Sequence, residues 1–101
     1  MARPSKLAAL MPAVVAAIEL GHYIYSNHAL ERQSQRKITR SEVLQALKGG
    51  YHEKAKDLYD DVYEAWNYAV RGKTLDRREL RIVVSFDVQG MLIVTAIDLK
   101  A

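Results

Sequence analysis

The stretch that decides the fold is LRIVVSFDVQGMLIVTAI, residues 80–97. In its first half, apolar residues occupy every second position, as in a strand with one buried face. These residues are Leu80, Ile82, Val84 and Phe86, and they alternate with Arg81, Val83, Ser85 and Asp87. Val88-Gln89-Gly90 then predicts a turn, and residues 91–97 are apolar on both faces. This stretch therefore predicts a β-hairpin whose second strand is central in a sheet.

Residues 51–70, which precede the hairpin, fit two structures. Their apolar side chains have helical spacing, at Ala55, Leu58, Tyr59, Val62, Ala65 and Trp66. A helix here would leave the hairpin as the whole sheet, and an isolated two-stranded sheet is only marginally stable in water. We therefore predict strands in this segment, with a helix as the alternative.

A helix is predicted over residues 5–20. Its apolar side chains follow three- and four-residue spacing, at Leu7, Leu10, Met11, Val14 and Ile18. Ser5 can cap its start and Gly21 its end. Pro12 would either kink this helix or be the first residue of a second one.

The same apolar run imitates a signal peptide, because Arg3 and Lys6 precede it. Glu19 comes early, however, and no convincing small-x-small cleavage site follows. The run is also shorter than the roughly 20 residues that a membrane-spanning helix needs. We therefore expect a core helix or a dimer-interface helix, and no membrane contact.

Two short helices are predicted next. Residues 22–25 are aromatic and β-branched, which suits either a brief strand or an extended lead-in. A helix is expected over about residues 27–35. Thr39 and Glu42 have the spacing of a capping box at the start of another helix, which Gly49-Gly50 ends.

Length and composition agree with one folded domain. A chain of 101 residues with 50% hydrophobic and 27% charged residues is too apolar for a disordered protein. No cysteine is present, so a disulfide framework is excluded and a cytoplasmic location is expected. We predict a single α+β domain, residues 1–101, with an N-terminal helix (1–21), a helical segment (22–50) and an antiparallel sheet of three or four strands (51–101).

The segment that follows residue 25 places a histidine and arginines at helical spacing. If Ser26 or Asn27 caps a helix, His28 and Arg32 lie four residues apart on one face, and Arg36 follows one turn later. Such a stripe is most often solvated helix surface. The alternative is a surface that binds phosphate, which the net charge of +3 permits but does not demand.

The same segment resembles a known family. Ser26-x-His28-Ala29-x-x-Arg32, followed by Arg36-x-Ile38-Thr39-x-x-Glu42-Val43, is similar to the opening signature of a family of small bacterial domains of unknown function. That family is grouped with RelE/ParE-type toxins and barnase-like ribonucleases. Further matches are Trp66-Asn67-Tyr68, Arg71-Gly72-Lys73, Leu80-Arg81-Ile82-Val83-Val84 and Leu92-Ile93-Val94-Thr95. The resemblance covers about residues 20–98 and implies a RelE-like fold, with strands near residues 53–58 and 65–70 and a turn at Asp60-Asp61.

The activity that the resemblance implies is metal-independent cleavage of RNA, or a toxin-type action on it. Cleavage by the neighbouring 2′-hydroxyl needs a base, an acid and cations beside the phosphate. Imidazole can exchange the protons and guanidinium groups can hold the phosphate. The candidate catalytic residues are therefore His28, Arg32, Asp57, Arg81 and Thr95, and the candidate nucleic-acid-binding residues are Arg36 and Lys56.

These candidates also have structural interpretations. Asp57 can pair with Lys54, and Thr95 suits a strand because it is β-branched. Arg81 stands where many relatives, as the resemblance implies, have a histidine, and arginine does not exchange protons near neutral pH. Acid–base chemistry would then depend on His28 alone or be absent, so whether the chain is an enzyme stays open.

The alternative function is a non-catalytic module that binds RNA or a protein. The histidines lack partners at metal-ligand spacing, so neither a metal nor another cofactor is expected. The expected partners are RNA, an antitoxin-like protein and, through the apolar side of the N-terminal helix, a second copy of the chain.

Overall fold

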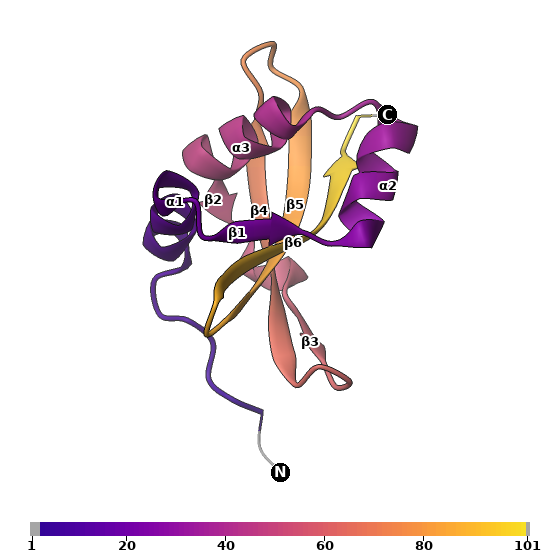
Figure 1. Cartoon of the computed structure of the whole chain (residues 1–101). Helices are drawn as coiled ribbons and strands as arrows, with labels where there is room; N and C mark the ends of the chain where they lie inside the picture. The colour runs from indigo at the N-terminus through magenta and orange to yellow at the C-terminus, as the bar shows by residue number, and fades with distance from the viewer. Residues whose placement is uncertain (1–2, 101) are drawn as a thin grey trace.

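The predicted hairpin lies in the middle of a six-stranded sheet in the computed structural model, which describes residues 3–100 (Figure 1). Its strands are β5 (Glu79–Asp87) and β6 (Gly90–Asp98), and β5 also pairs with β4 (Ala65–Lys73). Three short strands complete the sheet: β1 (Tyr23–Tyr25), β2 (Tyr51–His52) and β3 (Leu58–Asp60). The order is β1-β6-β5-β4-β2, and β3 pairs with β4 as well.

The α+β class is confirmed, and the strands of residues 51–101 pair antiparallel as predicted, but there are five of them and not three or four. β1 runs parallel to β6, which makes the sheet mixed. β4 is long enough to pair with β3 over its first residues and with β2 near its end. The two-residue strand β2 was not predicted as a separate strand, because two residues carry too little alternation to be recognised.

Residues 51–70 form strands and not a helix, as the stability of the sheet required. The strand predicted near residues 53–58 is wrong, however, because a 3₁₀ turn, η1 (Lys54–Lys56), separates β2 from β3. The carboxylate of Asp57 explains this departure, since it accepts a hydrogen bond from the backbone N–H of Ala69 at 2.9 Å. A side chain thereby replaces the backbone pairing that a continuous strand would have made.

The N-terminal helix α1 (Leu10–Leu20) starts five residues later than predicted, and Ser5 does not cap it. Pro12 explains the late start. It lies in the first turn of α1, where its missing N–H needs no partner, whereas a helix from Ser5 would place it in the interior. Gly21 ends α1 in the left-handed conformation, with φ of 71°, as predicted.

The other two helices, α2 (Asn27–Arg36) and α3 (Arg40–Gly49), match their predicted positions. The capping box of α3 is confirmed: Thr39 Oγ1 accepts from the N–H of Glu42 at 3.1 Å, and Glu42 Oε1 accepts from the N–H of Thr39 at 2.9 Å. The segment before α2 is the brief strand β1, which settles the choice left open by the sequence.

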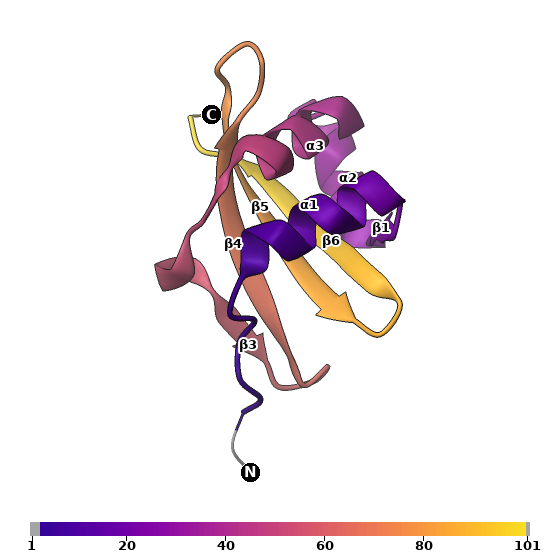
Figure 2. The same cartoon turned by 90° about the vertical axis from the view of Figure 1, so that its left-hand side faces the viewer.

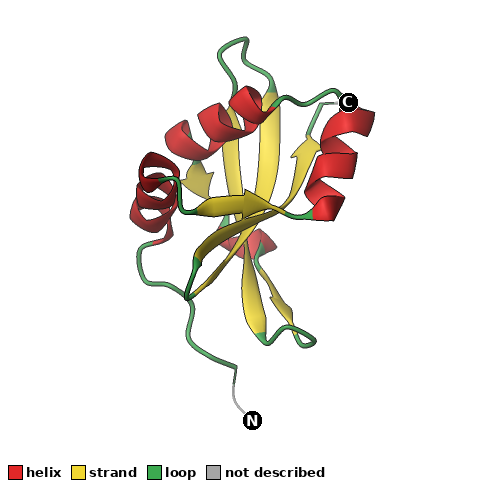
Figure 3. Ribbon diagram, viewed as in Figure 1, coloured by secondary structure: helices red, strands yellow, loops and turns green. Residues whose placement is uncertain are grey.

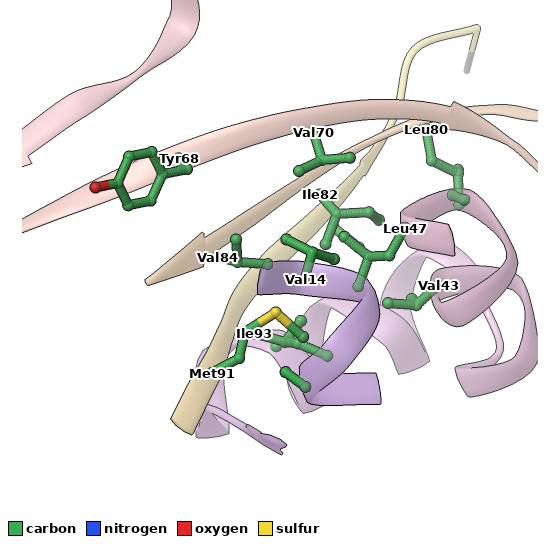
Figure 4. Close-up of a cluster of buried hydrophobic side chains, with 14 of the residues drawn as sticks. Val14, Val43, Leu47, Tyr68, Val70, Leu80, Ile82, Val84, Met91 and Ile93 are labelled. Atoms are coloured by element: carbon green, nitrogen blue, oxygen red, sulfur yellow. The ribbon is translucent and has the colours of Figure 1, made fainter. Parts of the chain in front are cut away.

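The helices α1 and α3 cover one face of the sheet, and α2 lies beside β6 (Figures 1 and 2). Between helices and sheet lies the core, drawn in Figure 4, with the fully buried side chains Val14, Val43, Leu47, Val70, Leu80, Ile82, Val84, Met91 and Ile93. Burial of this apolar surface is the main force that holds helices and sheet together.

The apolar side of α1 belongs to this core. Leu10 and Val14 are buried against the chain's own sheet and α3, and Met11 and Ile18 pack at the edge of the core. The stripe that suggested a dimer is therefore mostly covered within one chain. Among residues 3–100, no helix has both the length and the apolar character needed to cross a bilayer.

The opposite face of the sheet, called the open face below, carries the other file of side chains. Arg81 lies opposite Arg71, and Thr95 lies opposite Val83. Along their strands, Arg81 and Thr95 alternate with residues whose side chains point into the core. Asn67 has the same phase in β4, one residue before the buried Tyr68. Arg81, Thr95 and Asn67 therefore share the open face.

Candidate functional site

A β-bulge in β6 decides where the start of α2 lies. Val83 pairs with Thr95 while Val84 pairs with Ile93, so Val94 is an extra residue in β6. Bulges bend a strand and re-aim its neighbours, and they often occur next to functional sites. Here the bulge lies where β6 stops pairing with β1 and begins to contact α2.

Ser26 fastens the start of α2 to this bulge. Its N–H donates to the carbonyl of Ile93 at 2.9 Å, and its hydroxyl donates to the carbonyl of Val94 at 2.8 Å. The same hydroxyl accepts from the N–H of Ala29 at 3.0 Å, which is the N-cap bond of the helix. His28, between these anchored residues, is thereby held at the edge of the open face with its side chain exposed.

His28 lines a groove of about 450 Å³, which we call the His28 groove. Figure 3 shows the elements around it: the start of α2, the adjoining parts of β5 and β6, and the hairpin of β3 and β4. The lining residues are Ser26, His28, Asp60, Tyr63, Ala65, Asn67, Ser85, Phe86, Asp87, Leu92 and Val94. The groove thus combines apolar side chains with a histidine, an amide, a tyrosine, two serines and two carboxylates, a mixture usual in binding sites.

The two carboxylates that line the groove, those of Asp60 and Asp87, stabilise the turns beside it. Asp60 Oδ1 accepts from the N–H groups of Val62 and Tyr63 at 2.9 and 3.1 Å. Asp87 Oδ1 accepts from those of Gln89 and Gly90 at 2.7 and 3.1 Å. Each carboxylate therefore has one oxygen fixed by a turn.

Arg32 lies one helical turn beyond His28, on the same side of α2. Its Nη1 donates to Gln35 Oε1 at 3.4 Å, and within residues 3–100 it makes no ion pair. Arg36 differs, because its Nη1 donates to the carbonyl of Ala96 at 2.8 Å and so fastens the end of α2 to β6. Of the two arginines, Arg32 is the one available to a ligand.

Arg81 belongs to a charged cluster at the other end of the open face, made of Glu53, Arg71, Glu79 and Arg81. Glu53 accepts from Nε and Nη2 of Arg81 at 2.6 and 3.1 Å, and Arg71 lies 2.7 Å from Glu79. Ser85 in the groove is four residues further along β5, which is about 13 Å by the rise of a strand. The structure therefore does not bring Arg81 to His28.

The charges of this cluster shift one another's titration. Hydrogen bonds from Arg81 lower the pKa of Glu53, although partial burial works in the opposite direction. The bond to Glu53 correspondingly raises the pKa of Arg81. Both shifts favour the charged forms, as expected for paired groups.

Asp57 is enclosed elsewhere, at the junction of η1 and β3. Its side chain is 0% exposed, and its Oδ2 lies 2.7 Å from His52 Nε2 and 3.0 Å from Lys6 Nζ. Together with the bond to Ala69 N–H, these contacts satisfy both carboxylate oxygens. Asp57 pairs with Lys6 and not with Lys54, and it lies outside the groove.

Of the two remaining candidates, Thr95 lies next to a groove residue and Lys56 lies outside the groove. Thr95 follows the groove residue Val94 and lies half-buried on the open face. Lys56 is exposed in η1 and does not line the groove. Across residues 3–100, no group of three or more histidine, aspartate or glutamate side chains is placed to hold a metal ion.

Sequence reasoning missed three polar side chains of the groove, Asn67, Ser85 and Tyr63. Asn67 and Ser85 had a readable signal, because both have the strand phase opposite to the buried Tyr68 and Val84. Tyr63 gave no comparable signal, since it lies in the turn between β3 and β4, where no periodicity applies.

Comparison with known proteins adds one finding about relationship. Residues 25–98 match the family described as "Domain of unknown function (DUF4258)". No curated protein and no solved structure gives a significant match. The family match begins at the strand–helix junction that carries Ser26 and His28, and it extends through the last strand. Because it covers well over half of the residues, the chain belongs to the DUF4258 family.

Proposed function

We propose that the chain is a RelE-like, metal-independent endoribonuclease or toxin-type domain that acts on RNA at the His28 groove. The observation that carries this proposal is the position of His28, an exposed imidazole held by Ser26 on the wall of a groove that Asn67 and Ser85 also line. The similarity of the Ser26-to-Val43 signature to toxin-type domains supports the same function.

In this proposal, His28 and Arg32 act on one phosphodiester. His28 takes the proton from the ribose 2′-hydroxyl, whose oxygen then attacks the phosphorus. The bond to the 5′-oxygen breaks, and that oxygen takes a proton from water at the open groove; the hydroxide left behind takes back the proton held by His28, which restores the base. The product is a 2′,3′-cyclic phosphate, and the guanidinium of Arg32 offsets the negative charge that accumulates on the phosphate oxygens.

Arg81 has no direct part in this scheme, because its guanidinium is bound by Glu53. The positive charge beside the phosphate therefore depends on Arg32. If both arginines bound one phosphate, their losses would couple. We expect instead that Arg32→Ala alone weakens RNA binding. In the double variant Arg32→Ala/Arg81→Ala, the change in binding free energy should equal the sum of the changes in the two single variants.

The test is incubation of the purified chain with RNA in EDTA. We expect cleavage that leaves cyclic phosphate ends and that falls at least about 100-fold in His28→Ala, the usual contribution of a general base. His22→Ala is the matched control, since His22 is also exposed but lies outside the groove. Absence of cleavage, or equal cleavage by His28→Ala, would contradict the endoribonuclease proposal.

A second function is favoured by the hairpin of β3 and β4. Leu58, Val62 and Tyr63 are 71%, 85% and 81% exposed there, and clustered exposed apolar side chains suit a protein interface. This observation favours a non-catalytic module that binds a protein such as an antitoxin. Such a module would leave RNA intact under the same conditions, so the cleavage assay separates the two functions.

A further inference from the structure

The segment before α1, residues 3–9, lies against the β3–β4 hairpin and not within the helix. Figure 2 shows it running beside β3 before it reaches α1. It contacts the face of the hairpin that carries Trp66 and Tyr68, whereas the His28 groove uses the opposite phase, at Ala65 and Asn67. Any ligand of this second surface is therefore distinct from a ligand of the groove.

Two side chains of the hairpin bind the backbone of this segment. Trp66 Nε1 donates to the carbonyl of Pro4 at 2.8 Å. The hydroxyl of Tyr68 accepts from the N–H of Leu7 at 2.9 Å. Because both bonds go to main-chain groups three residues apart, they recognise an extended backbone and not particular side chains.

Two cationic side chains of the segment meet an aromatic pair and a carboxylate. Tyr59 and Trp66 pack edge to face, with ring centroids 5.3 Å apart. The guanidinium of Arg3 lies 5.0 Å from the centroid of Tyr59, and Lys6 Nζ lies 4.7 Å from that of Trp66. Lys6 also reaches the enclosed carboxylate of Asp57 at 3.0 Å. Aromatic faces and a carboxylate both attract cations, so this surface selects positive charge.

Residues 3–9 themselves are exposed, and even Leu7 keeps 40% of its surface in water. The segment therefore has no apolar anchor in the core, and its attachment depends on hydrogen bonds and charge. Contacts of this kind are weakened by salt and open more readily than a packed helix.

We propose that the surface formed by Asp57, Tyr59, Trp66 and Tyr68 is a binding site for an extended basic peptide segment with positive charges three residues apart. In the isolated chain, residues 3–7 occupy it. A segment of the same chemistry from another polypeptide replaces them when they are released. A phosphate-bearing ligand is disfavoured, because none of the four side chains that form this surface is cationic and the carboxylate of Asp57 would repel a phosphate.

Tethering sets the conditions for this exchange. A segment joined directly to its site acts as though present at about millimolar concentration. An external peptide must therefore exceed that concentration, or the internal segment must be weakened first. The double variant Arg3→Ala/Lys6→Ala weakens it without touching the receiving surface.

Trp66 reports on the site, because it is the only tryptophan of the chain. We expect the emission of the double variant to shift to longer wavelength and to be quenched more readily by acrylamide. Titration with a synthetic peptide of residues 3–9 should restore the parent emission with a saturating curve, more weakly at high salt. The parent chain should not respond to the peptide below about 1 mM.

The control variant is Lys48→Ala/Lys73→Ala, which removes two exposed charges outside the surface and should keep the parent emission. The control peptide carries alanine in place of both cationic residues. Unchanged emission in Arg3→Ala/Lys6→Ala, no response to the peptide, or equal restoration by the control peptide would each overturn the proposal. If the parent chain dimerises in a concentration-dependent way and the double variant does not, the site binds a second copy of this chain. That result would overturn the proposal of a different partner. If circular dichroism shows the double variant unfolded, Lys6→Gln carries the same test.

Discussion

The two ends of the open sheet face use polar side chains in opposite ways. In the charged cluster, Arg71 and Arg81 lie directly opposite each other, a repulsive arrangement that Glu53 relieves by contacting both. At the His28 groove, the polar side chains line an open hollow instead. The charge of Arg81 is thus satisfied within the fold, while the imidazole of His28, the amide of Asn67 and the hydroxyl of Ser85 line the groove where a ligand could reach them.

This contrast has a physical basis. A charged group held in a partly buried sheet needs a partner, since an unpaired charge there loses its hydration without compensation. An amide, a hydroxyl or an imidazole on an exposed groove wall keeps contact with water, so it needs no partner within the fold. Polar groups bonded within the fold, among them Ser26, Asp60 and Asp87 at the groove, should therefore affect stability when removed, whereas an exposed groove residue such as His28 should affect function only.

The strongest way to break this contrast is Asp57→Ala. Asp57 is the most enclosed of the polar groups bonded within the fold, and its loss leaves His52 and the N–H of Ala69 without their acceptor. We expect the free energy of unfolding to fall by about 1–3 kcal/mol, the usual cost of leaving buried hydrogen-bonding groups without their partner. Urea denaturation measures this change, with the exposed Asp61→Ala as control. A loss below about 1 kcal/mol would show that Asp57 is not a structural group.

A smaller effect is expected from acid on the charged cluster. The pKa of Glu53 is lowered from 4.5 by its bonds to Arg81, so its pairing stabilises the fold above that value and is lost as the pH falls through the folded pKa. Between pH 7 and pH 3, the parent should therefore lose more stability than Glu53→Gln, whose side chain does not titrate. Denaturation curves at each pH test this, with exposed Glu19→Gln as control. Parallel pH profiles of parent and Glu53→Gln would contradict it.

The smallest effect on stability is expected at the groove. His28→Ala should change the free energy of unfolding by no more than about 0.5 kcal/mol, because an exposed side chain away from caps and ion pairs contributes little. The thermal midpoint measures this directly. A loss of 2 kcal/mol or more would make His28 a structural residue and remove the contrast between the two ends.

Much of the local structure was readable from the sequence. Gly21, the pair Thr39 and Glu42, and the turn at residues 88–90 act through neighbours within a few residues, so their effects could be predicted. The start of α1 was mistaken although Pro12 carried the necessary information, because the apolar spacing continued across it. Among the candidate site residues, the position of His28 on a capped helix was readable, since Ser26 lies two residues before it.

The partners of the other candidates were not readable, because they lie far away in the chain. Asp57 forms an ion pair with Lys6, and Arg81 forms one with Glu53, and no sequence periodicity predicts either pair. The bulge at Val94 could not be predicted from the sequence either. Because β6 is apolar on both faces, its sequence does not show which of its side chains point to which face.

The sequence by itself determined the α+β class, the helix limits set by Gly21 and Thr39, and the central hairpin, because periodicity and capping act locally. Only the tertiary structure decided that a bulge at Val94 meets Ser26 and holds His28 over a groove. It alone also decided that Arg81 is paired. Such contacts depend on how distant strands come together, and the shape and satisfied hydrogen bonds of the assembled sheet select them.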